Sequence, residues 1–161
     1  MAGRRGGVLL LAILGAFAGG CIERAAENVL APFDPEVEYT RAMRPLIDDM
    51  NEARAKLLRI LEDYDAGRAT PSDIVSGIAA ARGVYREVRD SAAPVEAPPA
   101  FKEYHSALLD HLNLALEAFT LVEQCMVGLN ESACTESEYV FRKATAALDR
   151  SNAAMPAEWR A

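Results

Sequence analysis

Residues 101–126 read FKEYHSALLDHLNLALEAFTLVEQCM, and this stretch decides the fold class. Its seam positions alternate at intervals of four and three residues: Phe101, His105, Leu108, Leu112, Ala115, Phe119, Val122 and Met126. That spacing predicts an amphipathic α-helix that packs along one face in a bundle. Because further leucines lie off this face, we expect this helix to be the most buried in the molecule.

Two helices are predicted before this one, and each has a start signal. Asp34-Pro35-Glu36 and Thr70-Pro71-Ser72-Asp73 both combine a capping residue, a first-turn proline and an acid, as is typical of helix N-termini. Gly67 ends the first helix. The seam positions are Tyr39, Met43, Leu46, Met50, Ala53, Leu57, Ile60 and Tyr64 in the first helix, widened by Ile47, Leu58 and Leu61, and Ile74, Ile78, Ala81, Tyr85 and Val88 in the second.

A fourth helix is predicted after a break at Gly128 and Asn130. Thr135-Glu136-Ser137-Glu138 matches the capping-box pattern and marks its expected start. Its small residues indicate close packing against a neighbouring helix. The expected inner face consists of Phe141, Ala144, Leu148, Ser151 and Met155, with Val140 and Ala147 beside it.

These four segments predict the fold class. No segment has the period of a β-strand, and the connections are short apart from the proline-rich stretch 93–99. Short connections favour antiparallel neighbours, so we predict an all-α, up-down-up-down four-helix bundle. The alternative is a three-helix bundle with the fourth helix docked across it.

The N-terminus has the features of an export signal. Arg4 and Arg5 precede an apolar run, Val8 to Ala18, that is too short to span a bilayer. Ala18-Gly19-Gly20-Cys21 resembles the lipobox of bacterial lipoproteins. The resemblance implies removal of residues 1–20 and acylation of Cys21 with diacylglyceryl and palmitate chains. It departs from the family pattern at Ala18, where leucine is preferred.

The resemblance implies a division of the chain into four parts: a signal peptide (1–20), a lipidated cysteine and tether (21–33), the helical bundle (34–156) and a tail (157–161). Ordinary signal-peptidase cleavage after Ala18 is the alternative, and it would release a soluble periplasmic or secreted protein. Ile22 is not the aspartate associated with inner-membrane retention, which favours the outer membrane in a double-membraned bacterium.

The three cysteines of the chain favour the lipoprotein interpretation. Cys125 and Cys134 lie close together between the third and fourth helices and form a natural disulfide pair. Eight intervening residues do not match the spacing of a redox motif, so we expect a structural disulfide. Cys21 is then left over, and acylation accounts for it.

Charge and the absence of motifs exclude several functions. The chain carries 17 basic and 24 acidic residues, so phosphate backbones would repel it and nucleic acid is not an expected partner. It contains no nucleophile elbow and no glycine-rich phosphate loop, so no catalytic residue and no enzyme activity is predicted. Arg82, Arg86 and Arg89 share one side of the second helix, where a solvated or ion-paired edge is preferred over a site for an anion.

One weak ligand site remains as an alternative. His105 occupies a seam position and, with Met43 or Met50 on another helix, has the residue types that hold a haem or copper ion. Neither His105 nor His111, the two histidines of the chain, has a second metal-binding side chain three or four residues away, so no metal or cofactor is predicted. We therefore expect a membrane-anchored, extracytoplasmic binding module of the cell envelope, whose partner is an envelope protein or a small ligand. A small periplasmic haem- or metal-binding bundle using His105 is the alternative.

Overall fold

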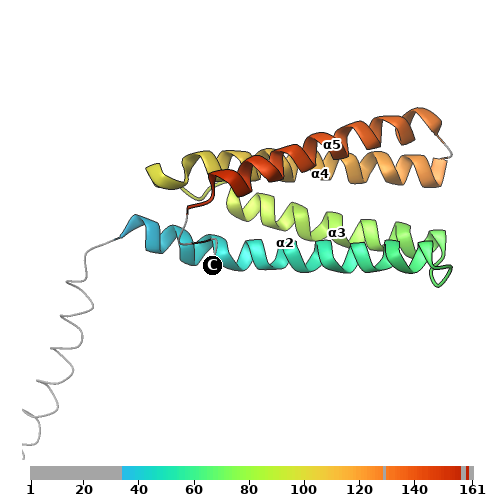
Figure 1. The fold of residues 1–161 in the computed structure, drawn as a ribbon, viewed down its shortest axis with the longest axis horizontal. Helices are drawn as coiled ribbons and strands as arrows, with labels where there is room; N and C mark the ends of the chain where they lie inside the picture. The colour runs from blue at the N-terminus through green and yellow to red at the C-terminus, as the bar shows by residue number, and fades with distance from the viewer. Residues whose placement is uncertain (1–33, 129, 157–158, 160–161) are drawn as a thin grey trace, which may run out of the picture. The chain divides into compact units, whose positions relative to one another are not determined.

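The computed structural model describes residues 34–128, 130–156 and 159, which form four long helices (Figure 1). They are α2 (Pro35–Asp65), α3 (Pro71–Ala92), α4 (Lys102–Gly128) and α5 (Glu131–Ala154), with a short 3₁₀ helix, η1 (Pro99–Phe101), before α4. This part of the chain contains no strand. The predicted signal peptide, Cys21 and the tether lie outside the described residues, as does the tail apart from Trp159.

The start of α3 is as predicted, whereas the start of α5 is not. The Thr70 hydroxyl accepts a hydrogen bond from the Asp73 amide, and the Asp73 carboxylate accepts one from the Thr70 amide. In α5, the capping residue is Asn130, whose side chain accepts from the Ala133 amide. Thr135 lies inside the helix instead, because Asn130 offers its side-chain oxygen one turn earlier, right after the break at Gly128.

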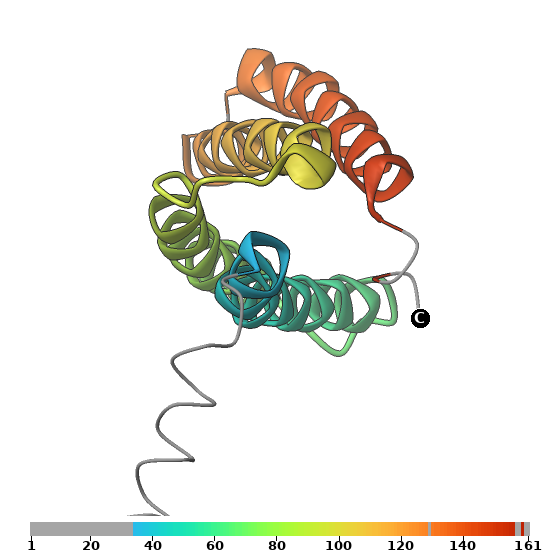
Figure 2. The same ribbon diagram turned by 90° about the vertical axis from the view of Figure 1, so that its left-hand side faces the viewer.

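Consecutive helices are antiparallel neighbours, which confirms the four-helix bundle. α2 packs on α3, α3 on α4 and α4 on α5. Seen end-on, the four helices follow one another around an arc (Figure 2). Within the described residues, no comparable packing joins α2 to α5. The bundle is therefore open along the side between its first and last helices, and α5 lies lengthwise along α4 and is not docked across a three-helix core.

The core follows the predicted seams most closely in the central helices. All five predicted seam residues of α3 are buried, and α4 carries the most buried residues, as expected. In α2, the predicted positions Leu58, Leu61 and Tyr64 are instead 47%, 38% and 43% exposed. For Leu58 and Leu61 the prediction was wrong because no described helix covers that side of α2.

The inner face of α5 also differs from the prediction. Its buried residues are Ala133, Ser137, Val140, Ala144, Ala147 and Ser151. Phe141, Leu148 and Met155, which were expected to point inward, are only half-buried. Small side chains occupy the line of contact because they let α4 and α5 approach closely, and the larger ones are displaced to the flank. The predicted close packing of small residues is confirmed.

Candidate functional site

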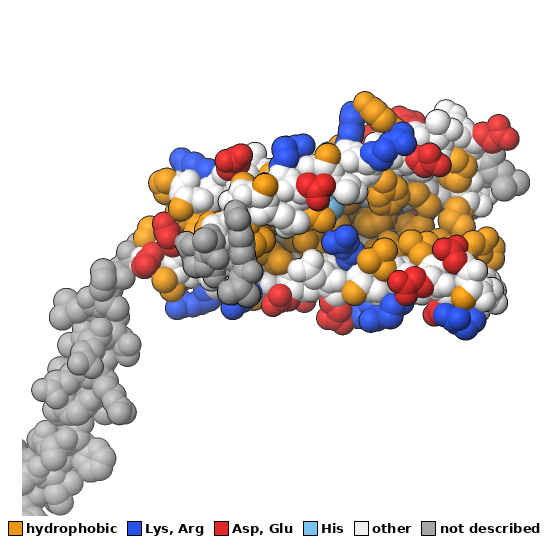
Figure 3. Space-filling view, in the orientation of Figure 1, with side chains coloured by type: hydrophobic (Ala, Val, Ile, Leu, Met, Phe, Trp, Pro, Cys, Tyr) orange, Lys and Arg blue, Asp and Glu red, His pale blue; other side chains and the backbone are white. Residues whose placement is uncertain are grey.

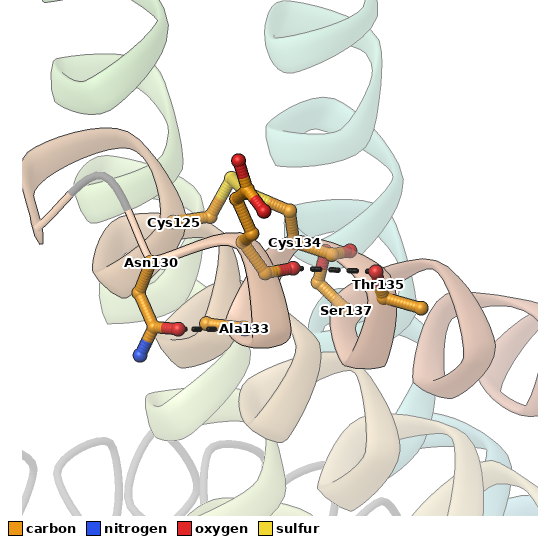
Figure 4. Close-up of a disulfide and its surroundings, with 7 residues drawn as sticks. Cys125, Asn130, Ala133, Cys134, Thr135 and Ser137 are labelled. Carbon is orange, nitrogen blue, oxygen red and sulfur yellow. Dashed lines mark hydrogen bonds between the residues drawn. A yellow bond between two sulfur atoms is a disulfide. The ribbon is translucent and has the colours of Figure 1, made fainter.

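The two C-terminal cysteines form the predicted pair. The Sγ atoms of Cys125, near the end of α4, and Cys134, in the first turn of α5, lie 1.98 Å apart, at disulfide-bonding distance (Figure 4). The loop they close also contains the Asn130 cap of α5. The disulfide therefore links the end of α4 to the start of α5 across the turn between them.

The weak ligand residues from the sequence are all buried. Met43 is fully buried, Met50 is 3% exposed and His105 is 8% exposed. Nδ1 of His105 lies 3.0 Å from the Tyr39 hydroxyl, so one ring nitrogen already has a hydrogen-bond partner. Burial lowers the pKa of His105 and favours its neutral form. A haem or metal site at His105 stays a prediction.

His111 is the functional candidate that the sequence did not single out. It is 6% exposed, and its Nδ1 lies 2.8 Å from the carbonyl oxygen of Ala144 on α5. A carbonyl oxygen can only accept, so Nδ1 carries the proton and Nε2 of the neutral ring holds a lone pair. Among the buried side-chain nitrogen and oxygen atoms of the described chain, only this Nε2 lacks a hydrogen-bond partner.

Two further polar groups lie near His111. The ring of Tyr85, from α3, meets the imidazole edge-on with the centroids 5.9 Å apart. Burial lowers the pKa of His111, and the positive charge of Arg54, from α2, contributes to the lowering. Burial also raises the pKa of Tyr85, an effect that Arg54 partly offsets. Arg54 is exposed, and it is near enough for its charge to act on both groups.

The position of Arg54 identifies which face of α2 borders the open side. Leu58 and Leu61 lie four and seven residues after Arg54, and Ile47 lies seven residues before it. Residues at these spacings share one face of a helix. A stripe made of Ile47, Arg54, Leu58 and Leu61 thus runs along the uncovered side of α2.

A row of aromatic rings from α3, α4 and α5 lies opposite this stripe of α2. Tyr85 packs edge-on against Phe119, and Phe119 in turn packs edge-on against Phe141 of α5, with centroid distances of 5.3 Å and 5.8 Å. Leu148 is half-buried two turns beyond Phe141. Figure 3 shows hydrophobic side chains gathered in the recess between α5 and α2. We call this recess the open groove; we assign Ile47, Leu58 and Leu61 on α2 and Phe141 on α5 to its walls.

A second groove lies between α2 and α3 and is less suited to a ligand. It measures about 440 Å³, and its floor includes Ala53, Leu57 and Val84. Acidic residues dominate its rim, and the single lysine there, Lys56, is paired with Glu52. It contains no buried polar group that lacks a partner.

The arginine edge of α3 is partly ion-paired and partly solvated, as preferred from the sequence, with Arg86 exposed. Arg82 pairs with Glu123 of α4, and Arg89 pairs with Asp90. The first of these pairs ties α3 to α4.

The described helices lack two further features. No group of three or more histidine, cysteine, aspartate or glutamate side chains is arranged to hold a metal ion. No helix among them has the length and hydropathy that crossing a membrane requires.

Comparison with protein-family models found no match to this chain, and searches of curated proteins and of solved structures found none either.

Proposed function

We propose that this protein is a lipid-anchored, extracytoplasmic lipoprotein whose helical bundle binds an apolar ligand in the open groove without transforming it. The anchoring part of the proposal is based on Ala18-Gly19-Gly20-Cys21. The pairing of Cys125 with Cys134 supports it, since Cys21 is then the cysteine left for acylation. Two acyl chains are enough for stable anchoring, whereas one is marginal.

The observation that carries the binding function is the apolar surface left uncovered between α2 and α5. Leu58 and Leu61 are exposed, whereas Tyr39, Met43, Met50 and Ala53 on the same helix are buried. An uncovered apolar surface costs about 25 cal/mol for each Å² that stays in contact with water. Grooves lined by apolar and aromatic side chains with a few polar groups are the usual form of small-molecule sites.

Binding is favoured over catalysis by the surroundings of His111. Its Nδ1 is held by a backbone carbonyl group, and its Nε2 has no serine, threonine or cysteine within hydrogen-bond distance. A histidine that activates a nucleophile needs that nucleophile beside it. Among its described residues, the groove therefore offers apolar and polar contacts to a ligand, and no nucleophile lies beside His111 for it to activate.

The anchoring is tested by metabolic labelling with palmitate followed by membrane fractionation. We expect the wild-type chain to take up label and to sediment with membranes, and Cys21→Ser to do neither. A wild-type chain that takes up no label and stays soluble would refute the anchor and favour the secreted form.

The groove is tested with an uncharged solvatochromic dye and the Cys21→Ser chain, which needs no detergent. We expect dye fluorescence to rise on binding, and Leu58→Glu with Leu61→Glu to weaken binding about tenfold or more because a buried charge is unfavourable. Tyr139→Glu is the control, since Tyr139 is also exposed, at 53%, but lies on α5 beside Lys143. Equal loss in both variants, or no fluorescence change in the parent, would contradict a site in the groove.

A further inference from the structure

The inner wall of the open groove brings together three polar groups from three helices: the guanidinium of Arg54, the hydroxyl of Tyr85 and Nε2 of His111. The last two are close because their rings are in edge-on contact. Arg54 is near enough for its charge to act on both. Every other contact of these rings described above is apolar or is the Ala144 carbonyl group.

The three groups have complementary hydrogen-bonding roles. Nε2 of His111 is a buried acceptor with no donor. The guanidinium of Arg54, which is exposed, and the Tyr85 hydroxyl are donors that a ligand can use. A buried polar group without a partner destabilises the folded chain, and a ligand that supplies the partner recovers this free energy.

The chemistry of these groups selects the head group of the ligand. A carboxylic acid has two oxygen atoms to accept from Arg54 and Tyr85, and it has one proton that can be shared with Nε2. An alcohol supplies a donor but no charge for Arg54, and an ester supplies no donor at all. An amine would be repelled by Arg54.

We propose that the open groove binds a long-chain carboxylic acid, with its head group at Arg54, Tyr85 and His111 and its alkyl chain along Phe119, Phe141 and the α2 stripe. This inference rests on the proposed binding function. At neutral pH the acid arrives as its carboxylate, so binding takes up one proton from solvent, which is held between the carboxylate and Nε2. The groups that face this proton are Arg54 from α2, Tyr85 from α3 and the uncharged Ala144 carbonyl group from α5.

The experiment is displacement of the uncharged dye from the Cys21→Ser chain by dodecanoate, 1-dodecanol and methyl dodecanoate, each below its aggregation concentration. We expect dodecanoate to displace the dye at about tenfold lower concentration than the other two, because its head group makes charge-assisted hydrogen bonds. Calorimetry in two buffers of different ionisation enthalpy should show uptake of about one proton for each dodecanoate bound.

Substitutions then assign the head-group site. Arg54→Gln should remove the advantage of dodecanoate over dodecanol, and because Arg54 is exposed the fold should persist. Arg59→Gln, an exposed cation on the same helix, is the control and should change neither. His111→Gln should abolish proton uptake. Circular dichroism of each variant establishes that it is folded.

The outcomes separate the two proposals. Absence of dye binding contradicts the groove itself. Dye binding with equal displacement by dodecanoate and dodecanol keeps the groove and overturns the carboxylic-acid inference. Stronger displacement by dodecyl phosphate overturns it in favour of a phosphate head group, and a Soret band in the purified chain overturns it in favour of iron at Nε2.

Discussion

The indole Nε1 of Trp159 donates a hydrogen bond of 3.2 Å to the Thr40 hydroxyl, so the C-terminal end of the described chain is attached to the beginning of α2. The Trp159 ring also packs on Tyr39, Phe101 and Tyr104, with centroid distances of 6.1, 5.1 and 5.6 Å. This aromatic cluster joins α2, η1 and α4 at one end of the bundle. It does so without closing the length of the α2–α5 side.

The first prediction concerns this attachment. Trp159→Ala should lower the free energy of unfolding by about 1–3 kcal/mol, because it removes several aromatic contacts and one hydrogen bond. Trp159→Phe, which keeps a ring but loses the indole N–H, should lower it by less. Urea unfolding of both variants is followed by circular dichroism. Tryptophan fluorescence cannot be used, because each substitution removes the only tryptophan of the chain. If Trp159→Ala unfolds at the same urea concentration as the parent, the contact with α2 does not stabilise the fold.

A second prediction concerns the disulfide. Cys125 and Cys134 are nine residues apart, and closing a loop of this size stabilises the folded state by about 2–3 kcal/mol on the chain-entropy account. We expect the double substitution to serine to lower the melting temperature by roughly 5–10 °C. Reductant should have the same effect on the parent chain and none on the double variant. Two free thiols in protein recovered from cells would contradict the pairing.

A third prediction uses two glycines of α3. A Cβ at Gly83 would meet nothing within 4 Å, whereas a Cβ at Gly77 would lie 2.6 Å from Cδ1 of Ile60. Alanine is the better helix former, so Gly83→Ala should raise the free energy of unfolding by about 0.5–1 kcal/mol. Gly77→Ala should raise it less or lower it, because Ile60 must move aside. Equal gains at both positions, measured by urea unfolding, would mean that α2 and α3 are not packed this closely at Gly77.

The helices and the buried residues of α3 and α4 could be predicted from the sequence, because the spacing of apolar residues follows the period of the helix. The prediction of buried residues failed where burial depends on how closely a neighbouring helix packs. Val140 is buried in α5 and the larger Phe141 beside it is not, because α4 approaches too closely for a phenyl ring. Leu58 and Leu61 were assigned to a seam because leucine spacing does not reveal whether a partner helix covers it.

The candidate site was missed for a related reason. Nothing in the sequence distinguishes Arg54 from the other charged residues of α2, and Tyr85 was predicted only as a seam residue of the second helix. His111 lies six residues after His105, about 240° around the helix, so the two histidines cannot face one ligand. One signal was available: leucines off the seam of α4 indicate a helix buried on more than one side, and His111 occupies that second side.

The last prediction is a loss of stability in mild acid caused by the two histidines. Burial lowers the pKa of both His105 and His111 below the value of about 6.5 expected in the unfolded chain. Below that pH the unfolded state binds more protons than the folded state, so stability falls as pH falls and levels off below the folded pKa values. The slope that the two histidines contribute should fade as the pH rises above the unfolded value, because both states are then deprotonated.

The measurement is the free energy of unfolding in urea at several pH values between about 7.5 and 5. Each histidine contributes a slope of at most about 1.4 kcal/mol per pH unit. Hydrogen bonds from Lys56 and Thr70 lower the pKa values of Glu52 and Asp73. These carboxyl groups therefore change the stability in more acidic solution, and between about pH 7.5 and 5 the change comes largely from the histidines. Replacing both histidines by glutamine should flatten the dependence, even if it also lowers stability at every pH. A double variant with the same slope as the parent would mean that the imidazoles are as accessible to protons in the folded chain as in the unfolded one.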